Sequence, residues 1–287
     1  MINKNTISQI AHYAIYSTRK ETPLPEKSML IFSTDVDVGS PELGILNRGK
    51  LDKDINFEYT EREIGKTEEQ FLPFFIEAFD KEGIPITFAV RGQLTEIDSL
   101  FMKTLLHCKV SHEIGAHGFY HKQFTDLTST EAEMELSQVS NGMRKYGIEP
   151  KSFIFPRNCI AHLDLLEKYG YLCYRGRGTL FNDSMRIEKY GNLYNVCPSL
   201  YMDVSSNLRL YKKILDISIK RKLPLHIWFH LWSCAKDVHS LPKFINNFLS
   251  PFLDYAAGQR QNEKLSIETM LSATKRVKDL EKNPNAF

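Results

Sequence analysis

An acidic pair follows a short apolar run near the start of the chain, MLIFSTDVD (29–37). Asp35 and Asp37 are two residues apart, and alternate side chains of a strand point to the same face, so both carboxylates are expected on one side. Two carboxylates at a strand end can divide the work of hydrolysis, because one can bind a metal ion while the other accepts a proton. An isolated D-x-D pair is more often a solvated turn, so this interpretation depends on other segments.

A histidine pair lies further along the chain, in GAHGFYH. His117 and His121 are four residues apart, and on a helical turn side chains at this spacing face the same way, about 6 Å apart. That distance suits two imidazoles that bind one metal ion, although H-x-x-x-H also occurs by chance. Together with the acidic pair it predicts an Asp–His–His site with an open position for water, the arrangement of a catalytic zinc ion.

Two further segments carry residues with suitable chemistry. In FIFPRN, Arg157 follows a proline, and its guanidinium could hold a carboxylate through two hydrogen bonds or form a surface ion pair. In LHIWFHLWS, His230 is the last histidine of the expected strand and can donate a proton to a leaving group. His226 lies deeper and is expected to be a hydrogen-bonded core residue. Trp232 is either an apolar wall of the site or a packed core residue.

The elements that must position these residues alternate apolar strands with amphipathic helices, which predicts an α/β fold with parallel strands. In β/α barrels the active residues lie at the C-terminal ends of strands, and all four clusters fall at or just beyond such ends. Thr130 is the expected cap of the long helix, with Glu133 three residues on. The expected strands are 29–37, 84–90, 112–117, 151–156, 171–176 and 223–230; the expected helices are 68–83, 96–107, 128–146, 162–169, 208–221 and 266–281; and long loops are expected over 39–66 and 179–206.

The composition indicates an ordinary globular protein. The chain has 287 residues and a net charge of +2 from 37 basic and 35 acidic side chains. Positive and negative charges are mixed along the chain, and the sequence shows no concentration of positive charge that would indicate a nucleic-acid partner. The five cysteines include no C-x-x-C pair, which favours reduced thiols over a disulfide framework. No apolar run is long enough for a membrane span and the first residues do not resemble an export signal, so a cytoplasmic location is expected.

The ordered set of motifs resembles the polysaccharide deacetylases, the NodB-homology group of carbohydrate esterases. The resemblance covers about residues 28–232. STDVDVG (33–39) is similar to the first motif, Thr-Phe-Asp-Asp-Gly, and EAFDKEGIPITFAV to the helix and strand that follow it. HEIGAHGFYH is similar to the second motif, in which both histidines bind the metal. The segment 131–157 resembles the helix that leads to a third motif containing Arg and Pro, and WFHLW resembles the last motif, whose histidine is the general acid.

This resemblance implies a distorted (β/α) barrel of about seven strands, formed by residues 1–287 as a single domain. It also implies a metal-dependent hydrolase that removes an N-acetyl or O-acyl group from a sugar or glycan precursor, in surface polysaccharide biosynthesis. A divalent ion, expected to be zinc, would bind Asp37, His117 and His121. Asp35 would be the base, oriented by Arg157, and His230 the general acid. The implied partner is a carbohydrate substrate, with the oligomeric state open.

The sequence departs from the family pattern in three places. Val36 separates the two acids, Arg157 follows the proline of the third motif instead of preceding it, and no clear fourth motif is present, NVCPSLYMD being the nearest segment. These departures keep a second interpretation open: a non-catalytic deacetylase-like protein that binds a glycan or an assembly partner. A barrel without any site would require all four strand-end clusters to be coincidence.

Overall fold

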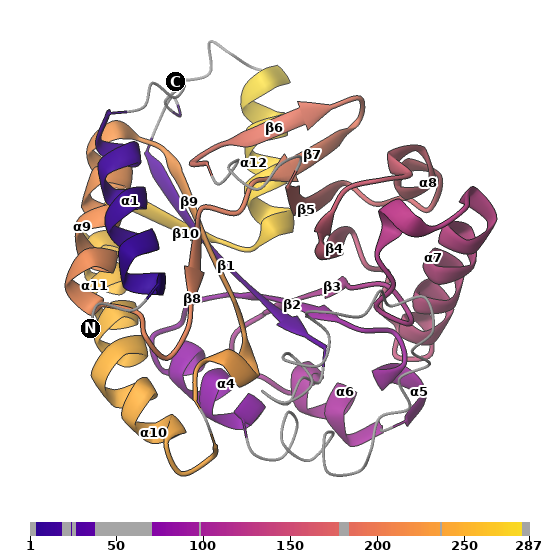
Figure 1. Ribbon diagram of the computed structural model, residues 1–287, viewed down its shortest axis with the longest axis horizontal. Coiled ribbons are helices and arrows are strands. Elements are labelled where there is room, and N and C mark those ends of the chain that lie inside the picture. Colours follow the sequence, from indigo (N-terminus) through magenta and orange to yellow (C-terminus); the bar gives the residue numbers. More distant parts are fainter. Residues whose placement is uncertain are drawn as a thin grey trace.

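The computed structural model describes residues 4–18, 24, 27–37, 71–97, 99–177, 184–235 and 237–282. The loop expected over 39–66 lies outside these residues. Figure 1 shows a sheet that curls around the middle of the molecule, with helices packed along its outside.

The described residues form one sheet of ten strands. Nine of them follow the order β6-β7-β5-β4-β3-β2-β1-β9-β8, and β10 pairs with the first half of β1. Every pairing is parallel except that of β6 with β7. The strands are β1 (Ser28–Val36), β2 (Thr87–Val90), β3 (Glu113–Ala116), β4 (Ser152–Cys159), β5 (Cys173–Arg177), β6 (Ile187–Tyr190), β7 (Leu193–Val196), β8 (Leu200–Met202), β9 (Pro224–His230) and β10 (Leu265–Glu268).

Most of the helices lie along the outside of this curled sheet, whereas α12 (Met270–Lys282) packs on its other face, against Met29 and Ile31 of β1 (Figure 1). The other helices are α1 (Lys4–Thr18), α4 (Leu72–Lys81), α5 (Leu94–Ile97), α6 (Ser99–Leu106), α7 (Ser129–Arg144), α8 (Leu163–Lys168), α9 (Leu208–Arg221), α10 (Leu241–Phe244) and α11 (Ser250–Gln261), with 3-10 turns at Phe124–Asp126 and Leu231–Ser233 and a π turn at Ile245–Leu249. The distorted (β/α) barrel expected from the motifs is confirmed, with ten strands in place of about seven.

Strand β1 lies in the middle of the fold, and all nine of its residues are buried. Leu30, Phe32 and Val36 belong to the main core, where Phe32 packs edge-on against Phe79 of α4. Its odd-numbered side chains Met29 and Ile31 pack in a separate cluster. Because alternate side chains share a face, Asp35 points to the same side of the sheet as these two residues. Burial on both faces explains why the first half of β1 contains the unbroken apolar run MLIF (29–32).

Strand β9 repeats this arrangement beside β1. Asp35 pairs in register with His230, so the two side chains lie next to each other on the same face of the sheet. Ile227 and Phe229 alternate with the histidines and belong to the main core, where Phe229 stacks on Phe75 of α4. The register of two parallel strands therefore brings an acid and a histidine together from segments far apart in the sequence.

Several sequence-based expectations about elements are wrong. The segment 179–206, expected to be a loop, contains β6, β7 and β8. Strand β6 has no alternation of buried and exposed side chains and β8 has three residues, so neither gives a strand pattern. The final helix begins at Met270 and not at residue 266, because β10 precedes it. The long helix α7 is capped by Thr128, which forms a capping box with Glu131, and not by Thr130.

Two expectations about the whole chain can be compared directly with the structure. All five cysteines are free, as expected from their spacing. None of the described helices combines the length and the apolar character needed to cross a lipid bilayer.

Candidate active site

The acidic pair lies where β1 ends. Asp35 is buried, and Asp37 is the first residue beyond the strand. Asp37 Oδ1 accepts a hydrogen bond from the indole nitrogen of Trp232, at 3.2 Å. This bond leaves the second oxygen of Asp37 facing the histidines. Trp232 is therefore a hydrogen-bond partner of Asp37, and it also packs against the main core, which agrees with one of the two expectations for it.

The histidine pair is carried by the loop that follows β3. His117 comes directly after the strand, and the chain turns at Gly118, where φ is +68°. His121 also lies in the left-handed region, with φ of +59°, which is uncommon for a residue other than glycine. The two rings lie edge to face, with their centroids 4.8 Å apart. The turn that brings these imidazoles together is thus irregular backbone, and not the helical turn that the spacing suggested.

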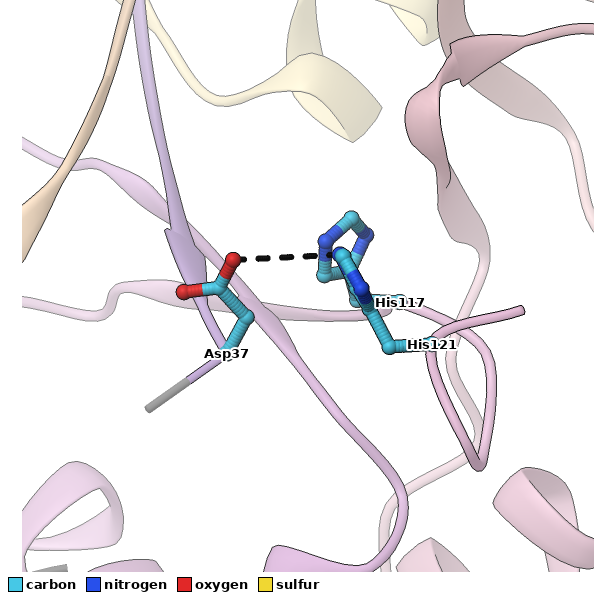
Figure 2. Close-up of side chains that lie close together, drawn as sticks. All are labelled: Asp37, His117 and His121. Carbon is cyan, nitrogen blue, oxygen red and sulfur yellow. Dashed lines mark ion pairs between the residues drawn. The ribbon is translucent and has the colours of Figure 1, made fainter. Parts of the chain in front are cut away.

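The acidic pair and the histidine pair meet (Figure 2). One potential ligand atom from each of Asp37, His117 and His121 lies within 4.8 Å of the other two. Asp37 Oδ2 is 3.8 Å from His121 Nε2. In the close-up the aspartate extends from the end of β1 toward both rings. The convergence that the sequence predicted is present in the structure.

The hydrogen bonding of His117 fits a divalent metal ion. Its Nδ1 is 2.8 Å from the carbonyl oxygen of Ile154, which fixes that nitrogen as the donor and leaves Nε2 with a free lone pair. Nε2 is buried and has no hydrogen-bond partner among the described residues. This nitrogen is therefore available as a metal ligand. One carboxylate and two imidazoles form a set of ligands typical of zinc.

The electrostatics of the cluster favour neutral imidazoles. Burial lowers the pKa of His117, and the neighbouring charges of Asp35 and Asp37 only partly oppose this effect. Burial also lowers the pKa of His121 well below its ordinary value, and the neighbouring His117 and Arg91 act in the same direction. Both histidines are therefore neutral at neutral pH, which is the form that binds a metal ion.

The guanidinium that holds Asp35 comes from Arg175 on β5. Arg175 Nη2 donates to both carboxylate oxygens of Asp35, at 2.6 Å each. Its other nitrogens donate to Ser33 Oγ at 2.8 Å and to Asn158 Oδ1 at 3.2 Å. The side chain is fully buried and lies over the ring of Trp228, 4.6 Å from its centroid. Arg175 therefore fixes Asp35 through charge-assisted bonds in a closed environment.

Arg175 also determines the charge state of Asp35. Burial alone would raise the pKa of this carboxyl group, but the nearby positive charge of Arg175 holds it below its ordinary value of 3.8. The charges of His117 and His230 act in the same direction. Asp35 is consequently ionised at neutral pH and can accept a proton.

Arg157 lies at the expected place in β4 but does not orient Asp35. Its side chain is exposed, and its backbone is in the left-handed region with φ of +57°. Both arginines belong to the described part of the chain, and Arg175 is the one that contacts Asp35. The sequence analysis missed Arg175 because no motif marks it. The only signal was an arginine within the otherwise apolar strand pattern YLCYRG.

His230 completes the cluster from the end of β9. Its Nε2 lies 3.6 Å from Asp35 Oδ2 and 3.6 Å from Asp37 Oδ2. Its Nδ1 is 3.2 Å from the hydroxyl of Tyr201 on β8. The ring is partly exposed, so it can reach a bound molecule as well as both carboxylates. The five residues expected to act together, other than Arg157, are thus gathered in one place.

His226 is a core residue, as expected. Its Nε2 is 2.8 Å from Ser33 Oγ and its Nδ1 is 3.0 Å from the carbonyl of Val196. Ser33 Oγ also accepts a hydrogen bond from Arg175, which in turn binds Asp35. His226 therefore helps to fix the position of Asp35 through Ser33 and Arg175.

Comparison with known proteins supports the resemblance. Residues 57–173 match the family model described as polysaccharide deacetylase. The matched segment includes His117 and His121, whereas the β1 carboxylates, Arg175 and His230 lie outside it. No curated protein sequence matches the chain significantly.

Solved structures share the fold. A protein assigned to the polysaccharide deacetylases from Mycobacterium smegmatis is 16% identical, with 91% of this chain and 94% of that chain covered and a TM-score of 0.67. A second one, from Pseudomonas aeruginosa PAO1, is 11% identical, with coverage of 91% and 95% and a TM-score of 0.66. The PuuE allantoinase is 12% identical, with coverage of 91% and 94% and a TM-score of 0.63. The family match and the barrel fold together confirm the resemblance of this chain to the polysaccharide deacetylase (NodB-homology) family of carbohydrate esterases.

Proposed function

We propose that this protein is a divalent-metal-dependent hydrolase that removes an acyl group, N-acetyl in the first instance, from a sugar or glycan precursor. One observation carries the proposal: an Asp–His–His cluster lies directly beside a second carboxylate and a third histidine. The family resemblance supplies the substrate class, and surface polysaccharide biosynthesis is the proposed setting.

Asp37, His117 and His121 would hold the metal ion, and zinc is the ion proposed. When bound, a divalent ion acts as a Lewis acid toward water and toward an acyl carbonyl. Trp232 keeps one oxygen of Asp37 occupied, so the carboxylate presents its other oxygen to the histidines. His117 is oriented by its bond to a β4 carbonyl, so a ligand-binding nitrogen faces the cluster without any rearrangement.

Asp35 is the proposed proton acceptor. It is ionised, buried, and fixed by two short bonds from Arg175, so its carboxylate cannot rotate freely. A fixed base in a closed site contributes about 10²–10⁴-fold to a hydrolytic rate. In amide hydrolysis it takes a proton from the water whose oxygen forms the new bond to the acyl carbon.

His230 is the proposed proton donor. When the carbon–nitrogen or carbon–oxygen bond breaks, the leaving group needs a proton, and a partly exposed imidazole at the strand end can supply it. His230 Nε2 lies 3.6 Å from a carboxylate oxygen of each of Asp35 and Asp37, so the ring stands directly beside the proposed base and the proposed metal ligand. Tyr201 contacts the other ring nitrogen and holds the orientation of the ring.

Hydrolysis of an amide outside a sugar is a second candidate, which the similarity to an allantoinase favours. Related sites can change substrate through their loops while keeping their chemistry. The non-catalytic interpretation is less supported, because the base and its arginine are present even though the third motif is altered.

The decisive assay measures acetate released from N-acetylglucosamine oligomers and from nucleotide-linked N-acetylglucosamine, and a parallel assay measures the ring opening of allantoin, the non-sugar amide. We expect zinc-dependent turnover, and a loss of at least about 100-fold in Asp35→Asn and His121→Ala. His107→Ala is the matched control, since this histidine is exposed and outside the cluster. Full activity in the first two variants would refute the residue assignment, and turnover of allantoin alone would replace the sugar proposal.

A further inference from the structure

A three-residue connector, residues 118–120, joins the two histidines proposed to bind the metal. Its three carbonyl oxygens are all bonded to the turn 91–93, which follows β2. Gly118 O accepts from Gly92 N at 2.8 Å, Phe119 O from Gln93 N at 3.3 Å, and Tyr120 O from Arg91 Nη2 at 3.2 Å. One side of the connector is thus fixed to the neighbouring strand end.

Glu135 of α7 fixes the other side. Its Oε2 accepts hydrogen bonds from the backbone nitrogens of Phe119 at 2.6 Å and Tyr120 at 2.9 Å. The side chain is only 2% exposed, and its Oε1 has no hydrogen-bond partner among the described residues. Burying a carboxylate in this way costs free energy unless its bonds compensate.

The backbone that Glu135 contacts is strained. The connector begins at Gly118 with φ of +68° and leads into His121 with φ of +59°. A left-handed backbone at a residue other than glycine costs about 1–3 kcal/mol and persists only where its surroundings enforce it. A Cβ atom at position 118 would lie 3.2 Å from Glu135 Oε2, so the carboxylate packs directly against the turn.

These contacts explain why a carboxylate is buried here. Burial raises the pKa of Glu135, while the two backbone donors oppose this shift. No ion pair to Glu135 is found in the part of the chain that the structure describes. The bonds to the connector are therefore its main compensation, and they lie within two residues of His121.

We propose that Glu135 is a positioning residue that holds the connector, and through it His121, in the geometry that binds the metal ion; this inference rests on the metal centre proposed above. Among the described residues, no hydrogen bond or ion pair joins Glu135 to the side chain of His117 or His121, and its bonds go to Phe119 N and Tyr120 N. It acts on the backbone between them, so its reach to the two amides matters more than its charge.

The test is a cobalt(II) titration of purified full-length protein, followed by the visible absorption of the bound ion, with affinities measured by chelator competition. Glu135→Gln keeps the reach and an acceptor oxygen but removes the charge. Glu135→Asp keeps the charge but withdraws the acceptor by one methylene, and Glu135→Ala removes it. Glu133→Gln on the same helix is the matched control, because Glu133 is bonded at the surface to Lys168 and Tyr169.

We expect Glu135→Asp and Glu135→Ala to weaken cobalt binding by about 10–100-fold and to change the visible spectrum. Loss of a group that orients a metal ligand commonly has an effect of this size. The cobalt affinities of Glu135→Gln and Glu133→Gln should stay within about threefold of the wild-type affinity, and their visible spectra should match that of the wild type. Affinities are compared among variants whose circular dichroism shows a folded chain; if the Ala variant does not fold, the Asp and Gln variants carry the test.

Wild-type affinity and spectrum in folded Glu135→Asp would overturn the role of Glu135. A loss in Glu135→Gln as large as that in Glu135→Asp would overturn it too, because charge and not reach would then be decisive. If the wild-type protein itself binds no cobalt, the proposed metal centre fails, which is a result distinct from these two.

Discussion

The pairing of Asp35 with Arg175 is the residue contact on which the proposed base depends. A buried carboxylate without a partner would carry a raised pKa and would be protonated over part of the neutral range. Here the arginine donates to both oxygens at 2.6 Å and keeps the group ionised. The same arginine links Asp35 to Ser33 and, through it, to His226. The base is therefore fixed from inside the barrel.

Replacing Arg175 should show that the charge state of Asp35 depends on this arginine. In Arg175→Gln the burial of Asp35 is no longer offset by a positive charge, so the pKa of Asp35 rises. The acidic limb of the kcat/KM profile then moves to higher pH, and kcat falls at least about tenfold. Arg186→Gln is the control, because Arg186 pairs with Glu188 away from the site. A profile unchanged by Arg175→Gln would show that Asp35 does not act as the base.

The sequence could predict the convergence of Asp35, Asp37, His117, His121 and His230 because each lies at the end of a parallel strand, and such ends gather at one rim. It could not predict Arg175. In the sheet, β5 is separated from β1 by β4, β3 and β2, so this contact crosses the barrel and depends on how strongly the sheet curls. Glu135 was missed for a similar reason, since its bonds are to backbone groups and leave no side-chain pattern.

At the scale of elements, the capping of α7 determines where the helix behind the histidine loop begins. Thr128 accepts from the backbone of Glu131, and Glu131 accepts from the backbone of Thr128. Thr128→Ala should lower the free energy of unfolding by about 1 kcal/mol. Thr130→Ala, at the position that the sequence suggested, should change it by less than about 0.5 kcal/mol. Urea unfolding of both variants measures this, and equal losses would contradict the assignment of the cap.

Strong periodic elements were predicted well, and short or irregular ones were not. The expected helix 208–221 has the bounds observed for α9, because its apolar face is regular and Asn207 caps it. In contrast, α10 and α11 went unrecognised. They are joined by a π turn at Ile245–Leu249, and Pro251 sits in the first turn of α11, where its missing N–H is tolerated. Patterns with a fixed period cannot show such a junction.

The whole molecule should lose stability in mild acid. Burial lowers the pKa of His226 to about 3, whereas its ordinary value is 6.5. Between these values the unfolded chain takes up a proton that the folded chain does not, so the free energy of unfolding falls as the pH falls from about 6.5 toward 3. One such group contributes a slope of up to about 1.4 kcal/mol per pH unit. The lowered pKa values of His117 and His121 act with the same sign.

Urea unfolding at pH 7.5 and 5.5, with a chelator present, measures this effect. His226→Gln should lower stability at pH 7.5, because it disturbs the contacts of Ser33 and Val196, and should flatten the dependence on pH. A dependence equally steep in this variant would mean that His226 is not the group that remains neutral in the folded protein.

The central claim is that one metal ion binds where the ends of β1 and β3 meet. Anomalous diffraction at the zinc edge, from crystals of the full chain grown with zinc, tests it most directly. The proposed site predicts one anomalous peak about 2.0–2.2 Å from a carboxylate oxygen of Asp37 and from one ring nitrogen each of His117 and His121. The absence of a peak there, or a zinc ion there that either histidine fails to contact, would contradict it.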